Sequence, residues 1–187
     1  MKSSVTDEEL MMAYANGDAA AFETLFKRHQ GALFRYCKRQ CQNHSVAEEL
    51  FQEVWVKVMK ARKSYAPTAK FNTYLFTLAH NLLVDYFRSV ASKTDGLSSE
   101  NLVDPDLTSN VDTNGVFQKV DLKVKVEHLF HIVAKLPTKQ REVFLLREET
   151  GMSMQQISKV LDTNQETVKS RLRLALKNLR QGMVGYE

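Results

Sequence analysis

Apolar residues recur every three or four positions through most of this chain, which is the period of a helix with one buried face. In the N-terminal part, this pattern predicts four helices, the last running from about residue 72 to 90. Capping residues mark two of the helix starts: Thr6 with Glu9 forms a capping box, and Asp18 begins a long second helix. The four apolar stripes can close a small core.

The pattern is lost in residues 92–115, where Ser, Thr, Asp, Asn and Gly dominate, and this composition predicts a flexible linker. Helical spacing resumes over residues 116–136, Pro137-Thr138 breaks and re-caps it, and a further helix covers residues 143–147. Strand-like alternation does not appear. The sequence therefore predicts an all-α fold with two small helical domains, at residues 1–91 and 116–187, joined by the polar linker at residues 92–115.

Residues 153–177 are typical of a helix-turn-helix. Ser153 with Gln156 forms a capping box, and Thr163 with Glu166 is expected to start the second helix in the same way. The apolar residues of that second helix form one stripe, so its polar and basic residues should face solvent. Such a helix suits a DNA major groove; the residues expected to contact DNA are Thr167, Lys169, Ser170, Arg171, Arg173 and Lys177.

Charge and composition are compatible with this interpretation. Basic residues outnumber acidic ones by four, and the excess lies on either side of an acidic linker. No apolar run is long enough for a membrane span and no signal-type core is found, so we expect a cytoplasmic protein without membrane insertion. No glycine-rich phosphate loop, metalloprotease motif or nucleophile elbow is present, so we expect neither an enzyme nor a cofactor.

Cys37 and Cys41 lie one helical turn apart, with His44 behind them and His29 two turns ahead. Such a set could bind zinc or sense redox state. Because metal ligands usually come from two separate elements, we favour a core position for Cys37 and a helix-end position for Cys41, with no metal.

Four segments in this order resemble a bacterial RNA polymerase sigma factor of the extracytoplasmic-function group: residues 21–29, 48–55, 71–88 and 136–144, followed by the helix-turn-helix. The resemblance implies a subunit that binds core RNA polymerase, recognises the minus-35 and minus-10 elements of promoter DNA and aids strand opening. It also implies control by an anti-sigma factor that acts on both domains. On this basis, the basic helix at residues 167–177 reads the minus-35 element.

The resemblance assigns the remaining functional residues. The helix that docks on the clamp coiled coil of the largest polymerase subunit carries Glu49, Leu50, Gln52, Glu53 and Trp55; alternatively, Trp55 is core and the acidic residues form a solvated face. The residues expected to bind the minus-10 element and its extruded base are Tyr65, Asn72, Tyr74, His80, Asn81 and Arg88. Tyr74 replaces the usual Trp, and Thr77 and His80 replace frequent Arg residues. The alternative interpretation of His80 is an exposed polar residue without a role in DNA binding. In the second helix of the helix-turn-helix, Leu174 and Leu176 stand where many relatives carry Arg, so base specificity does not transfer from a relative.

Two other classes of protein share some of these features. A two-domain helix-turn-helix regulator would bind DNA without core polymerase. An enzyme of nucleic-acid metabolism would show metal-dependent turnover in the absence of polymerase.

Overall fold

The computed structural model describes residues 5–93 and 118–184, and the secondary structure within these ranges is helical. The eight helices are α1 (Asp7–Ala15), α2 (Ala19–Cys41), α3 (His44–Ala61), α4 (Phe71–Lys93), α5 (Gln118–Lys135), α6 (Thr138–Thr150), α7 (Met154–Val160) and α8 (Gln165–Gly182). The all-α prediction is confirmed. Most of the expected linker, residues 92–115, lies outside the described residues.

Three of the predicted helix starts have the expected capping chemistry. The Thr6 and Ser153 hydroxyls accept hydrogen bonds from the amides of Glu9 and Gln156, the third residues of their helices, and the side chains of these two residues accept bonds from the cap amides in return. Asp18 caps α2 by accepting from Ala20 and Ala21. These bonds satisfy amides that a helix N-terminus otherwise leaves without partners, which is why the sequence marks the boundaries clearly.

Two other predicted caps are wrong. Helix α8 is capped by Asn164, whose side chain accepts a bond from Thr167 N, and not by a Thr163–Glu166 box. Asp162 has a left-handed backbone (φ 44°), which turns the chain so that the next helix begins one residue later than expected. At α6, the residue before the helix is Pro137 and no side chain caps it, so Thr138 does not re-cap the chain.

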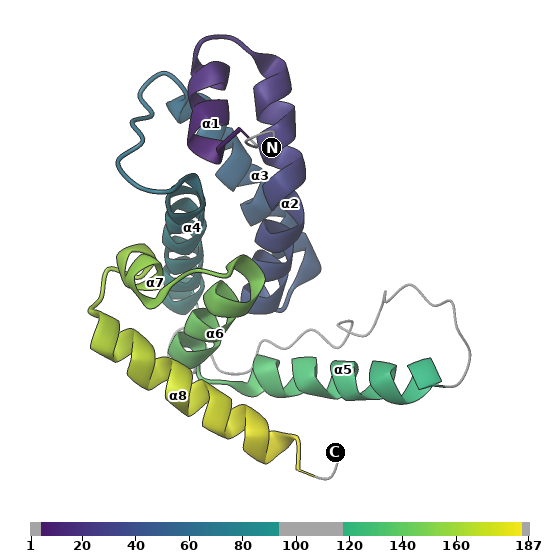
Figure 1. Cartoon of the computed structure of the whole chain (residues 1–187). Helices are drawn as coiled ribbons and strands as arrows, with labels where there is room; N and C mark the ends of the chain where they lie inside the picture. Colours follow the sequence, from purple (N-terminus) through teal and green to yellow (C-terminus); the bar gives the residue numbers. More distant parts are fainter. Residues whose placement is uncertain (1–4, 94–117, 185–187) are drawn as a thin grey trace.

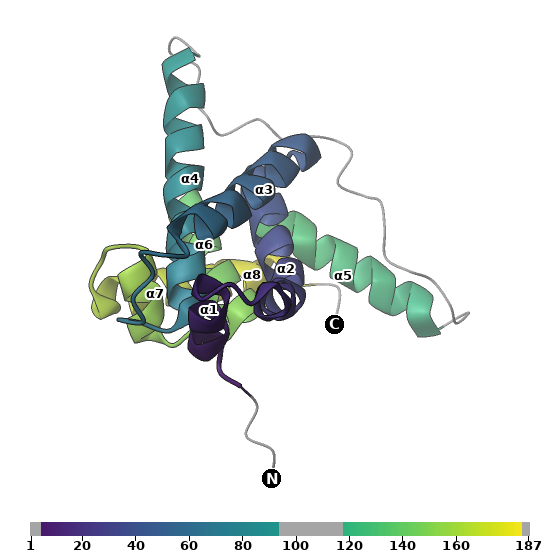
Figure 2. The ribbon, with the colours of Figure 1, turned by 90° about the horizontal axis from the view of Figure 1, so that it is seen from above.

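Helices α1 to α4 form one half of the molecule and α5 to α8 the other (Figure 1). In the first half, α2 packs against α1, α3 and α4; in the second, α8 packs against α5, α6 and α7. Helix α5 projects away from the other helices over much of its length (Figures 1 and 2). The buried apolar residues of both halves belong to a single cluster, because α6 packs on α2 and α7 packs on α4.

Arg141 is the most unusual member of the contact between the halves, since it is a charged residue with only 7% of its surface exposed. Its guanidinium donates to Ala134 O (2.8 Å), to Gln40 Oε1 (3.2 Å) and to Gln40 O (3.4 Å). Gln42 Nε2 also donates to Ala134 O (2.8 Å). The ends of α2 and α5 and the start of α6 therefore meet at one buried cation.

The cap of α8 gives a direct test of the helix-turn-helix boundary. Replacing Asn164 by Ala should lower the free energy of unfolding by about 1 kcal/mol, because Thr167 N loses its acceptor. Thr163→Ala is the matched control and should change it by less than about 0.5 kcal/mol. Urea denaturation followed by circular dichroism measures both, and a larger effect at Thr163 would contradict the assignment.

Candidate functional site

The exposed side of α8 presents a basic surface. Lys169, Ser170, Arg173 and Lys177 are exposed, while Thr167 and Arg171 are partly buried at its edges. Buried Val168, Ala175 and Leu179 fix the opposite side against the core. All six residues predicted to contact DNA thus lie on α8, although the Lys169 ammonium is 2.7 Å from Glu166 and would exchange this ion pair for a phosphate. Leu174 and Leu176 are also exposed, so they add apolar surface to α8.

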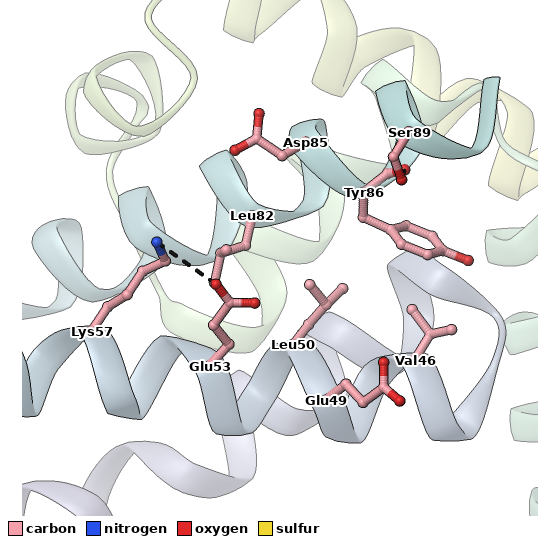
Figure 3. A pocket seen from close by; sticks show the side chains of 9 residues that line it. All are labelled: Val46, Glu49, Leu50, Glu53, Lys57, Leu82, Asp85, Tyr86 and Ser89. Carbon is pink, nitrogen blue, oxygen red and sulfur yellow. Dashed lines mark hydrogen bonds and ion pairs between the residues drawn. The ribbon is translucent and has the colours of Figure 1, made fainter. Parts of the chain in front are cut away.

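A second surface lies on α3 and on the groove between α3 and α4. Exposed Glu49, Gln52, Glu53 and Val56 follow helical spacing, so they form one stripe. Beside it is an open pocket of about 360 Å³, lined in part by Val46 and Leu50 of α3 and by Tyr86 of α4, whose ring lies on the Val46 side (Figure 3). Lys57 Nζ lies 3.7 Å from Glu53 Oε1 on the rim. The pocket therefore combines an apolar floor with an acidic edge, a composition suited to a basic helix of a partner protein.

Trp55 does not belong to this exposed stripe. It is 4% exposed and packs edge-on against Phe22 and Phe51 and at a tilt against Phe26. Leu50 is also largely buried. Trp55 therefore takes the alternative position stated for it above: residues 54 and 55 point into the core, and the exposed apolar residue is their neighbour Val56. The sequence spacing of Glu49, Gln52, Glu53 and Val56 would have identified it.

A third group surrounds the N-terminal half of α4 and the loop before it. The ring centroids of Tyr65 and Tyr74 lie 5.3 Å apart, and Phe71 contacts both rings. Burial raises the pKa of Tyr65 to about 12, with Glu8, Tyr74 and Asp7 adding to the effect, so its hydroxyl stays protonated. Asn72 borders this aromatic cluster, whereas Asn81 and Arg88 lie further along α4 and are exposed. The six predicted minus-10 residues therefore share one loop and helix but do not form a single pocket.

His80 is engaged with the other half of the molecule. Its Nδ1 lies 2.6 Å from Glu142 Oε1 of α6, and the same carboxylate oxygen accepts a bond from the buried Tyr36 hydroxyl at 3.2 Å. The alternative of an exposed polar histidine is wrong. Asn72 Nδ2 also reaches α6, at 3.5 Å from Thr150 O. Nothing local in the sequence indicates Glu142, because the pair is 62 positions apart.

Further ion pairs join α6 to α2. Glu149 of α6 pairs with Arg39 and with Arg35, whose Nε lies 2.7 Å from it. Burial and the neighbouring Arg35 lower the pKa of Arg39 to about 10. Burial, followed by the nearby Glu142 carboxylate, raises the pKa of Tyr36 well above its usual range. The contact between the halves is thus rich in polar groups, several of them dependent on partners from the other side.

Two family matches cover most of the chain. Residues 25–93 match sigma-70 region 2, and residues 129–179 match sigma-70 region 4. The chain is 28% identical over 174 residues to the extracytoplasmic-function RNA polymerase sigma factor SigK of Mycobacterium sp. (strain KMS), covering 91% of this chain and 87% of that protein. It is 25% identical over 193 residues to the sigma-E factor of Escherichia coli (strain K12), covering 98% and 99%.

A solved structure shares the fold. The sigma factor RpoE of Bartonella quintana, determined in complex with the anti-sigma factor NepR, superposes with a TM-score of 0.67 at 20% identity, covering 87% of this chain and 96% of that one. At this level of identity the likeness concerns the fold alone. No helix of residues 5–93 or 118–184 is long and apolar enough to cross a membrane.

The two cysteines are buried in α2. Among the residues that the structure describes, no group of three or more His, Cys, Asp and Glu side chains is placed to hold a metal ion. Burial raises the pKa of each thiol to about 12, with Cys41 adding to the effect at Cys37 and the Arg141 cation opposing it at Cys41. Cys37 is a core residue and Cys41 is the last residue of α2, as expected, and both groups stay protonated and shielded.

This burial predicts slow thiol chemistry in the folded protein. At pH 8, an ordinary thiol with a pKa near 8.5 is about one-quarter thiolate, whereas a pKa of about 12 leaves roughly one in ten thousand. Labelling with Ellman's reagent should be at least about 100-fold slower for native protein than for protein in guanidinium chloride. Equal rates would contradict the burial of both cysteines.

Proposed function

Since the chain belongs to the extracytoplasmic-function group of bacterial RNA polymerase sigma factors, we propose that it binds core RNA polymerase and directs it to promoters with defined minus-35 and minus-10 elements. Its activity is controlled by an anti-sigma factor. The observation that carries this proposal is the coexistence of a region 2 and a region 4 match, in that order, with an acidic face on the first half and a basic helix-turn-helix on the second. We place the protein in the cytoplasm, where the polymerase supplies the catalysis.

We assign promoter recognition to two surfaces. The α8 residues Lys169, Arg171 and Arg173 contact bases and phosphates of the minus-35 element, because guanidinium and ammonium groups on a groove-entering helix supply these contacts. The aromatic cluster of Tyr65 and Tyr74, with Asn72, receives an extruded base of the minus-10 element. Residues 1–91 and 116–187 are the corresponding domains, and residues 92–115 connect them.

Core binding belongs to the α3 stripe and the groove beside it. Glu49, Gln52 and Glu53 supply charge and amide groups, while exposed Val56 and the groove residue Tyr86 supply apolar surface. A coiled coil of the polymerase clamp with basic residues along one side would be complementary to this surface. Trp55 and Leu50 hold α3 in position through the packing of its buried side.

The described arrangement favours a closed state of the free protein. His80 and Asn72 of α4, assigned here to the minus-10 element, contact α6, and α7 packs on α4. A DNA strand therefore reaches this part of α4 only after α6 and α7 move away. In contrast, the α8 surface and the α3 stripe are already exposed. We infer that core binding precedes full exposure of the minus-10 surface.

Reconstitution with sigma-free core polymerase tests the function. The wild-type chain should co-elute with core enzyme in gel filtration and support run-off transcription from promoters selected from a randomised library. Gln52→Ala with Glu53→Ala should abolish most co-elution, whereas Arg171→Ala should preserve it and lower transcription by about tenfold or more, the value of one good base contact. Glu23→Ala, an exposed α2 carboxylate, is the control. A helix-turn-helix regulator would bind the same DNA without polymerase.

The closed state predicts that Glu142→Ala will increase access to α4. The change removes the acceptor of a buried Tyr36 hydroxyl and the partner of His80, which should destabilise the contact by about 1–3 kcal/mol. Hydrogen exchange of α4 amides should accelerate near His80, and binding of the single-stranded minus-10 sequence by the free protein should rise several-fold. The exposed neighbour Glu148→Ala should change neither. Unchanged exchange in Glu142→Ala would argue against the closed state.

A further inference from the structure

The first residue of α4, the last helix of the N-terminal half, is held by a carboxylate from α1, the first helix of that half. Phe71 N donates to Glu8 Oε1 at 2.6 Å, and the two residues are 63 positions apart. A helix N-terminus leaves its first amides without partners and carries partial positive charge, so a carboxylate at this point is favourable on both grounds. Glu8 therefore acts as a cap for α4 supplied from another helix.

Glu8 lies in the first turn of α1, and the position of this turn is fixed by its contacts. The capping box of Thr6 with Glu9 holds the start of α1. Its neighbour Asp7 pairs with two α2 side chains, at 2.7 Å from Arg28 Nη1 and 2.7 Å from His29 Nε2. Because Asp7 ties α1 to α2 directly beside Glu8 and the capping box holds the first turn of α1, the carboxylate has little freedom to leave the α4 amide. Asp7 and Glu8 lie N-terminal to the residues that match sigma-70 region 2, which begin at residue 25, whereas their partners lie within that match.

The capped amide sits at the centre of the aromatic cluster. The Phe71 side chain is fully buried, and its ring centroid lies 6.3 Å from that of Tyr65 and 6.1 Å from that of Tyr74. His29, already fixed by Asp7, contacts the Phe71 ring at 5.3 Å. The loop of residues 62–70 ends at this point. Any shift of the α4 start would therefore move the two tyrosines relative to each other.

One atom of the cluster is incompletely bonded. Within the described part of the chain, the buried Tyr65 hydroxyl has no hydrogen-bond partner. This hydroxyl keeps its capacity to donate and accept a hydrogen bond, as the side-chain nitrogens of Gln40 and Trp55 keep theirs to donate elsewhere in the core. Glu8 and Asp7 lie close enough to influence this hydroxyl. The α1 carboxylates thus border the place where a base would stack.

We propose that Glu8 is a positioning residue for promoter opening: by capping α4, it holds Phe71, Tyr65 and Tyr74 in the geometry that receives the extruded minus-10 base. The inference rests on the proposed function and adds α1 to the machinery of strand capture. Glu8 does not contact the DNA. Its removal should weaken capture of the single strand while leaving the α3 stripe and the α8 surface unchanged, because α1 packs mainly on α2 and α4.

The test compares full-length holoenzymes carrying Glu8→Ala, Glu8→Gln and the control Glu23→Ala. The probe is the non-template strand of a promoter selected from the randomised library, with 2-aminopurine in its minus-10 element. We expect Glu8→Ala to weaken binding of this strand about fivefold, the usual effect of losing a helix cap. Glu8→Gln keeps an acceptor oxygen and should recover most of the affinity. Core binding and binding of a minus-35 duplex should stay within about twofold of wild type.

The outcomes separate this inference from the proposed function. Equal strand binding by wild type and Glu8→Ala would overturn the positioning role alone. A parallel loss of strand, core and minus-35 binding would also overturn it, because Glu8 would then serve only general stability. If the wild-type holoenzyme itself bound no strand, the proposed function would fall and this inference with it. The amide resonance of Phe71 supplies a further check, since loss of its carboxylate partner should shift that signal in Glu8→Ala and not in Glu23→Ala.

Discussion

The buried guanidinium of Arg141 is the constraint on which the arrangement of the two halves depends. A buried cation without acceptors would cost far more free energy than a small protein can spare. Its acceptors are the side chain and carbonyl of Gln40 and the carbonyl of Ala134, which come from α2 and α5. The start of α6 must therefore lie where both helices end. Burial lowers the pKa of Arg141 while nearby Glu142 opposes the shift.

Once Arg141 is fixed, the register of α6 on α2 follows. Glu142 is next in sequence and reaches Tyr36 and His80, and Glu149 lies two turns further along and reaches Arg39. Helix α7 then packs on α4, and α8 is left on the outside with its basic side exposed. The same contact therefore determines which proposed DNA surface is covered and which is open.

Local features of this fold can be predicted from the sequence, while contacts between residues far apart in the chain cannot. Caps such as Ser153 act within four residues, so their residue types reveal them. At α8, Thr163 and Asn164 are both good caps, and only the left-handed turn at Asp162 selects the second. The binding surfaces show the same division: the α8 residues follow from helical spacing, whereas the partner of His80 depends on packing between distant helices, which no local pattern encodes.

The polar character of the contact between the halves is compatible with the opening proposed above, in which a chain that is closed when free extends on a promoter. Ion pairs and hydrogen bonds exchange for bonds to water at small net cost, so an interface built from them separates more easily than an apolar one of equal area. Each half keeps its own helix packing when they part, for example α2 on α3 and α6 on α8. In the proposed opening, polymerase and DNA would supply the free energy of separation, while the caps and aromatic contacts within each half would preserve the binding surfaces.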